Sequence, residues 1–84
     1  MTSEEIRSAV LRALSRVAPE IDVATLRSDV PIRDQVDIDS MDFLNFVIEL
    51  NRDVHVEVPE ADYPHLRTLD GAVKYLGTRI PVLR

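Results

Sequence analysis

Residues 37–50 read DIDSMDFLNFVIEL, and this stretch determines how the rest of the chain can fold. Its apolar residues recur at steps of three and four, which predicts a helix from about Ser40 to Asn51. Serine and aspartate are both favoured at helix N-caps, so the Asp-Ser pair at the start of the helix indicates a cap at Ser40. A chemical role for Ser40 is the alternative interpretation.

The predicted helix carries two apolar stripes and one narrow polar face when its residues are placed about 100° apart. One stripe is enough to pack a surface helix against a core. The second stripe therefore indicates either a helix in the middle of a bundle or a pocket or contact surface beside Ser40. The first stripe contains Phe43, Phe46, Val47 and Leu50, the second Met41, Leu44 and Ile48, and the polar face Asp42, Asn45 and Glu49.

A first helix is predicted upstream of this stretch. Thr2 and Glu5 fit a capping box, in which each side chain caps the backbone N–H group of the other residue. Apolar residues then follow at helical spacing, and Pro19 ends the helix near Ala18. The residues expected to face the core are Ile6, Ala9, Val10, Ala13, Leu14 and Val17.

Residues 19–39 show no sustained helical period, and their prolines and aspartates favour turns. Aliphatic side chains are nevertheless scattered through them, more than a disordered linker would carry. We therefore expect a long ordered loop that is pinned to the core, with a short helical turn near Thr25.

The segment after the central helix is expected to be extended and then helical. Residues 52–59 alternate like a strand, but a lone strand has no partner, so we expect an extended connection with Val54, Val56 and Val58 pointing inward. A short helix over about residues 60–65, cut by Pro64, is predicted to follow.

The last predicted helix begins at Thr68, a favoured N-cap residue, with Asp70 well placed against the helix dipole. Gly77 fits its C-terminal stop, and the tail over residues 78–84 is expected to be partly loose. The buried face of this helix is expected to contain Leu69, Ala72, Val73 and Leu76.

These elements predict an all-α fold: a small four-helix bundle, with three main helices, one short helix and a long ordered first loop. The 84 residues are enough for a single domain over residues 1–84. The chain has no cysteine, which excludes disulfides and thiolate metal sites. We recognise neither a signal peptide nor a membrane-spanning run, and therefore expect a cytoplasmic protein without membrane insertion.

The charge of the chain narrows the class of its partners. A net charge of −5 argues against nucleic acid, whose binding relies on lysine and arginine. The acidic residues are concentrated, because residues 29–62 hold ten acids and two bases, a net of −8. Such a field attracts a basic partner and repels an acidic one.

Ser40 lacks the groups that a catalytic serine needs. A nucleophilic serine requires a base and a third group that orients the base, and the chain has no Gly-x-Ser-x-Gly pattern. His55 and His65 are the only histidines, and two histidines without grouped ligands make a poor zinc site. We therefore predict no enzymatic activity, no catalytic residue and no metal site.

The order of these features resembles the acyl carrier protein family. DIDSMDFLNFVIEL is similar to that family's Asp-Ser-Leu motif and the helix that follows it. Further on, VHVEVP, a short helix and RTLDGAVKYL resemble the family's Val-Glu-Ile-Pro-like segment and its Thr-led last helix at similar spacings. The resemblance covers roughly residues 3–77, and it is the ordered set of motifs that makes it specific.

The resemblance implies that Ser40 carries 4′-phosphopantetheine through a phosphodiester. A separate phosphopantetheinyl transferase would install this arm from coenzyme A with magnesium. The thiol of the arm would hold an acyl group as a thioester for fatty-acid, polyketide or related synthesis. Such a carrier needs neither cysteine nor a catalytic base, because the reactive sulfur belongs to the prosthetic group. The N–H groups and the positive dipole end of a helix start favour the attached phosphate.

Two sets of residues near Ser40 are candidates for binding. The acids would contact basic groups on the transferase and on acyl-processing enzymes, while the second apolar stripe would border a space for the acyl chain. The candidates for partner binding are Asp39, Met41, Asp42 and Glu49, and those for the acyl pocket are Leu44, Phe46 and Ile48.

The sequence departs from the family's commonest pattern at three positions. Met41 replaces the usual leucine, Asn45 stands where an acid is frequent, and Val54 stands where many members have phenylalanine. A general fatty-acid carrier and a specialised carrier for another pathway both stay open. A peptidyl or aminoacyl carrier, and a carrier-like interaction protein that is never modified, are further alternatives. In each case we expect a monomer.

Overall fold

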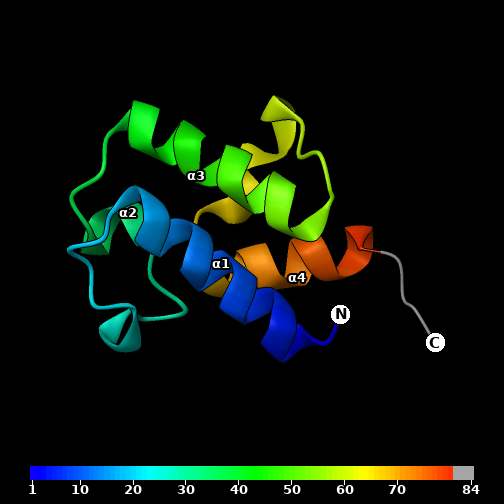
Figure 1. Cartoon of the computed structure of the whole chain (residues 1–84), viewed down its shortest axis with the longest axis horizontal. Helices are drawn as coiled ribbons and strands as arrows, with labels where there is room; N and C mark the ends of the chain where they lie inside the picture. The colour runs from blue at the N-terminus through cyan, green and yellow to red at the C-terminus, as the bar shows by residue number, and fades with distance from the viewer. Residues whose placement is uncertain (81–84) are drawn as a thin grey trace.

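The computed structural model describes residues 1–80, and its regular structure is helical (Figure 1). Across these residues there is no strand, and no helix is long and apolar enough to cross a membrane. The prediction of an all-α bundle is therefore confirmed. The elements are α1 (Ser3–Val17), the 3₁₀ helix η1 (Val23–Thr25), α2 (Ile32–Gln35), α3 (Ser40–Val54), the 3₁₀ helix η2 (Glu60–Leu66) and α4 (Leu69–Arg79).

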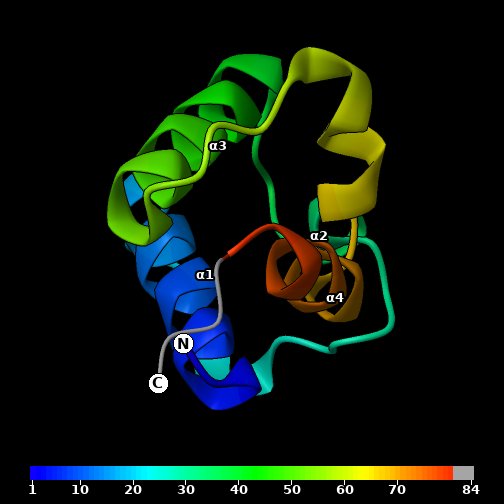
Figure 2. The ribbon, with the colours of Figure 1, turned by 90° about the vertical axis from the view of Figure 1, so that its right-hand side faces the viewer.

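Three helices enclose the core. α1 and α3 lie side by side and run in opposite directions, and α4 packs against α1 (Figures 1 and 2). η2 packs against α4, on the side of the core that lies across from α1 (Figure 2). The long segment between α1 and α3 passes around the end of the bundle and brings α2 next to η2 (Figure 2).

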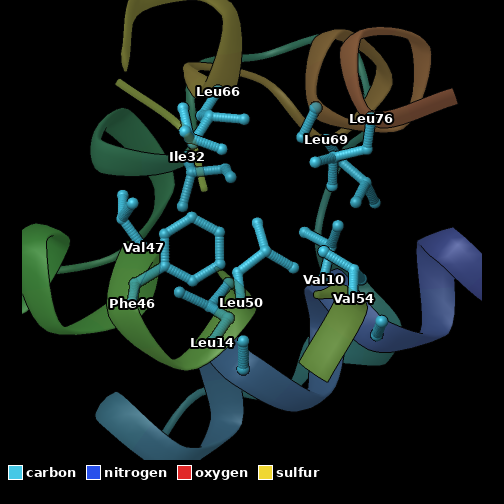
Figure 3. Packing of buried hydrophobic residues seen from close by; sticks show 14 of the residues in the cluster. Val10, Leu14, Ile32, Phe46, Val47, Leu50, Val54, Leu66, Leu69 and Leu76 are labelled. Carbon is cyan, nitrogen blue, oxygen red and sulfur yellow. The ribbon is translucent and has the colours of Figure 1, made fainter. Parts of the chain in front are cut away.

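The first apolar stripe of α3 is the centre of the core (Figure 3). Phe46 and Leu50 are fully buried, whereas Phe43, at the edge of the stripe, is partly exposed. Leu14 of α1 packs from the other side, as its helical spacing predicts. The largest fully buried side chains are Phe46, Leu14, Ile32, Leu50, Leu66, Leu69, Leu76, Val10 and Val47.

The start of α1 has the predicted capping box. The Thr2 hydroxyl accepts a hydrogen bond of 3.1 Å from the Glu5 N–H group, and the Glu5 carboxylate accepts one of 2.7 Å from the Thr2 N–H group. The helix ends at Val17 with Ala18 as its C-cap, directly before Pro19, as predicted.

The central helix is longer than predicted, because α3 runs to Val54 instead of ending near Asn51. Val54 is buried, and this burial holds the last turn of the helix. His55 then ends it in the left-handed conformation, with φ 57° and ψ 38°. Glycine is the usual residue in that position, so the sequence lacks the ordinary signal for this stop. In the extended connection that follows, Val56 and Val58 pack inward as predicted.

The loop between α1 and α3 is ordered and tied to the core. A helical turn near Thr25 was predicted and is present as η1, but α2 was not foreseen. The Ile32 N–H group donates a 2.7 Å hydrogen bond to the Arg67 carbonyl oxygen, and the Asp70 N–H group donates one of 3.0 Å to the Ser28 carbonyl oxygen. These bonds join the loop to the start of α4.

Two predicted helix boundaries near the C-terminus were wrong. Pro64 lies inside η2 and does not cut it, because the fixed φ of proline suits a 3₁₀ helix. Gly77 lies inside α4, which continues to Arg79 and ends at Ile80. A helical glycine costs only about 1 kcal/mol relative to alanine, and the end of the helix gains the Arg79–Asp62 ion pair and the packing of Ile80 against the core. Thr68 caps α4 as predicted, and the predicted loose tail lies, from residue 81 on, outside the described residues.

Phe46→Ala should lower the free energy of unfolding by about 3–5 kcal/mol, because it removes a fully buried ring from the centre of the core. Chemical denaturation followed by circular dichroism measures this loss. Leu44→Ala on the same helix is the control, and this exposed site should change stability by about 0.5 kcal/mol or less. Equal midpoints for the two variants would show that the buried face of α3 has been assigned wrongly.

Candidate functional site

Ser40 is the first residue of α3, and it is exposed. The predicted cap at Ser40 was wrong, because Asp39 is the N-cap. Oδ1 of Asp39 accepts a 2.8 Å hydrogen bond from the Asp42 N–H group, and Oδ2 of Asp42 accepts one of 3.3 Å from the Asp39 N–H group. This reciprocal pair is a capping box built from two aspartates. The Ser40 hydroxyl is therefore not needed to start the helix.

The capping box also determines which backbone amides remain for a ligand. An α-helix leaves its first four N–H groups without an intrahelical partner. In α3, the carboxylates satisfy the amides of Asp39 and Asp42, which leaves those of Ser40 and Met41. These amides and the positive dipole end suit a phosphodiester on the Ser40 oxygen, although the two carboxylates oppose it. The residues present thus fit an attached phosphate.

The second apolar stripe of α3 faces outward. Met41, Leu44 and Ile48 are 65%, 40% and 48% exposed, so the interpretation of α3 as a central helix with two buried stripes is wrong. Single exposed apolar residues are common on proteins, but three in a row beside Ser40 form a continuous strip. The strip offers an apolar contact surface that starts at Ser40 and runs along the helix.

The polar face of α3 lies beside this strip and carries two kinds of acid. Asp39 and Asp42 have no cationic partner within the described part of the chain. Glu49, by contrast, is 3.3 Å from Nη1 of Arg16 and 3.9 Å from Nη1 of Arg52. Sequence reasoning missed the contact with Arg16 because it joins two helices that are far apart in the chain.

The structure places the acyl-pocket candidates in different environments. Phe46 is fully buried in the core, whereas Leu44 and Ile48 lie on the exposed strip. A hollow of about 430 Å³ opens elsewhere, between α2, α3 and η2, on the side of α3 that carries Phe43. Its lining residues are Pro31, Arg33, Asp34, Phe43, Tyr63, Pro64 and Arg67.

Aromatic rings form part of the wall of this hollow. The Phe43 and Tyr63 rings meet edge to face, with 6.2 Å between their centroids. Phe43 lies one turn after Ser40, which puts the hollow next to the start of α3. Because Phe43 lies one turn after Ser40, its place near the site could be predicted from the sequence. Tyr63 and α2 could not be placed there, because only the tertiary fold brings them to the site.

The two histidines have structural roles. His55 ends α3, and the His65 ring stacks on Tyr75 with 5.1 Å between centroids. In the described range, no three histidine, aspartate or glutamate side chains come together to hold a metal ion. Neither histidine is placed beside Ser40 by any contact in the structure.

An exposed serine at a helix start, with two free amides and an apolar strip beside it, is suited to the covalent attachment of a phosphate-linked group. Comparison with known proteins agrees with this class. The family model described as phosphopantetheine attachment site matches residues 4–76. An acyl carrier protein of Lactobacillus johnsonii (strain CNCM I-12250 / La1 / NCC 533) is 32% identical over 76 residues, which cover 90% of this chain and 94% of that protein.

The chain therefore belongs to the family of acyl carrier proteins and related phosphopantetheine carriers, as the resemblance of its motifs predicted. Members of this family carry covalent 4′-phosphopantetheine and are carriers, not catalysts. Their work requires contacts with a transferase and with acyl-processing enzymes.

Proposed function

We propose that this chain is a discrete acyl carrier protein in which Ser40 bears 4′-phosphopantetheine. The observation that carries the proposal is the position of Ser40: it is exposed at the first turn of α3 and takes no part in the capping box. When bound, the group supplies a flexible arm whose terminal thiol holds the cargo as a thioester. The chain holds the attachment point at a defined place on a rigid helix.

The cargo is proposed to be an acyl group for fatty-acid, polyketide or related synthesis. Support comes from the hollow beside Ser40, in which the rings of Phe43 and Tyr63 offer contact area to a short apolar chain, among charged side chains at Arg33, Asp34 and Arg67. The acyl carrier protein of Lactobacillus johnsonii is a further support. A peptidyl or aminoacyl carrier is the alternative, and the activating enzyme that loads the arm would distinguish the two.

We define the docking face as the exposed strip of α3 together with the acids next to it: Asp39, Met41, Asp42, Leu44, Ile48 and Glu49. Its apolar residues provide contact area, and its acids attract basic groups on the transferase and on acyl-processing enzymes. Carrier encounters must be brief, since one protein visits several enzymes. Charge steering suits such encounters because it raises association rates more than residence times.

The proposal includes a single carrier domain over residues 1–84, a monomeric state and a cytoplasmic location. These three features stay predictions from the sequence. Size-exclusion chromatography with light scattering measures the oligomeric state, and fractionation of cells measures the location.

Incubation with a broad phosphopantetheinyl transferase, coenzyme A and magnesium should add one phosphopantetheine arm to the protein, as measured by intact mass. Ser40→Ala should abolish this increase, because it removes the only oxygen proposed to accept the phosphate. Ser28→Ala is the control and should load normally. A wild-type protein that gains no adduct with several transferases would instead support the unmodified interaction protein.

Asp42→Gln should slow this loading severalfold at low salt, because it removes one charge from the docking face. The glutamine amide can still accept the hydrogen bond from Asp39, so the helix start should remain intact. The difference should shrink at high salt, since exposed charges are screened over about 8–10 Å at moderate ionic strength.

Glu57→Gln is the matched control for this charge change. Glu57 is exposed and lies beyond the other end of α3, so its neutralisation should leave the loading rate nearly unchanged. Equal rates for both variants at low salt would mean that recognition rests on the apolar strip alone.

Loading a medium-length acyl chain should raise the melting temperature above that of the form with an empty arm. Each CH₂ group that leaves water contributes roughly 0.8 kcal/mol. Tyr63→Ala should abolish the gain if the chain enters the hollow, and Leu44→Ala should abolish it if the chain lies along the strip, as the sequence predicted. Equal melting temperatures for the two wild-type forms would show that the chain stays in solvent.

A further inference from the structure

The polar face of α3 carries a row of carboxylates that extends past the docking face. Asp42, Glu49 and Asp53 follow one another along the same side of the helix, with Asn45 between the first two. From the sequence alone, the whole row is available to a basic partner. In the structure this row has two halves, and the net charge of the half near Ser40 differs from that of the half remote from Ser40.

Arg16 occupies the half that is remote from Ser40. It lies in the last turn of α1, and its Nη1 atom is 2.7 Å from Oδ2 of Asp53 and 3.3 Å from Oε1 of Glu49. One guanidinium nitrogen thus bridges two carboxylates of the neighbouring helix. The hydrogen bond to Asp53, followed by the charge of that residue, raises the pKa of Arg16 above its usual value.

Arg16 is the most exposed of the three residues in this bridge. The side chains of Asp53 and Glu49 are 17% and 27% exposed, whereas that of Arg16 is 46% exposed. The two acids are therefore less accessible to a partner than the guanidinium that pairs with them. Arg52 adds a second cation, 3.9 Å from Glu49.

The consequence is an uneven field along the docking face. The two acids of the remote half are balanced by Arg16 and Arg52, so that half has no net charge. Asp39 and Asp42, beside Ser40, keep their charge uncompensated by the other residues that the structure describes. A basic partner is therefore drawn to the Ser40 end.

We infer that Arg16 is a specificity-determining residue of the docking face, an internal counter-ion that covers Glu49 and Asp53 and confines charge recognition to the end that carries Ser40. This inference rests on the proposed function, and the partner to which it is applied is the phosphopantetheinyl transferase. An arginine of the transferase has to displace Arg16 before it can pair with Glu49 or Asp53. At Asp42 it meets no such competitor.

The effect should be seen in rates and not in folding. Partly exposed ion pairs contribute little to stability, whereas a change in surface charge acts directly on the rate of encounter. A gain in loading without a change in melting is therefore the signature of an internal counter-ion, and a purely structural bridge would not produce it.

The test compares Arg16→Gln with Arg12→Gln. The two variants lose the same charge from the same helix, one turn apart, but the structure gives Arg12 no ion pair among residues 1–80. The kcat/KM for loading by the transferase is measured at low and at high salt. Arg16→Gln should raise it by about two- to fivefold at low salt and much less at high salt, whereas Arg12→Gln should change it little.

A second set of variants ties any gain to the two acids. Arg16→Gln combined with Glu49→Gln and Asp53→Asn should return the rate to that of the wild type or slightly below it, because Arg52 is then left without its partner acid. Asp53→Asn alone, at a site outside the docking face, should slow loading less than Asp42→Gln does. This single variant keeps the inference testable even if Arg16→Gln lowers the melting temperature.

Three results would overturn the inference. The first is an equal rate for Arg16→Gln and Arg12→Gln at low salt, and the second is a gain that persists when both acids are neutralised. A fall in rate for Arg16→Gln would also overturn it, since Arg16 would then contact the transferase itself. Absence of loading on the wild type contradicts the proposed function instead, so the two failures are distinguishable.

Discussion

The burial of one side of α3 in the core, against α1, is the contact on which the other features depend. Phe46 and Leu50 have no exposed surface, and moving either to solvent would cost several kcal/mol. This locks the rotation of α3 about its own axis. Once that rotation is set, Met41 and Ile48 must face solvent, and the polar face must lie beside them. The position of the proposed docking face is thus a geometric consequence of core packing.

The Asp39–Asp42 capping box adds the second constraint, because it determines the residue at which the helix begins. Rotation and start together define the position of Ser40 along and around the helix. In many proteins a serine in this sequence context would itself be the cap. Here the aspartate before it takes that role and leaves the hydroxyl available for modification.

Features set by local chemistry were predictable from the sequence. The capping box of α1, the Thr68 cap of α4 and the buried stripe containing Phe46 all follow from spacing and residue type. The family was also accessible, because its motifs occur in order along most of the chain. The two caps and the buried stripe depend on residues within a few turns of one another.

Features that depend on contacts between distant segments were not predictable. α3 ends at His55, where the sequence has no glycine to indicate a helix end. The burial of Val54 extends the helix into a last turn that helix propensity alone would not favour. α2 exists because the loop is pinned at Ile32. The bridge from Arg16 to α3 joins residues with no local relation. The outward direction of the second apolar stripe could not be predicted either, because the sequence does not show which of the two stripes packs into the core.

The hydrogen bonds between the long loop and the start of α4 have a mechanical consequence. The bond from Ile32 to the Arg67 carbonyl joins α2 directly to the end of η2, and both elements line the hollow together with Phe43 of α3. A shift of either α2 or η2 alone would break this hydrogen bond, so the two walls that they form are coupled mechanically. Any change in the width of the hollow would therefore be made against α3, the helix that carries Ser40.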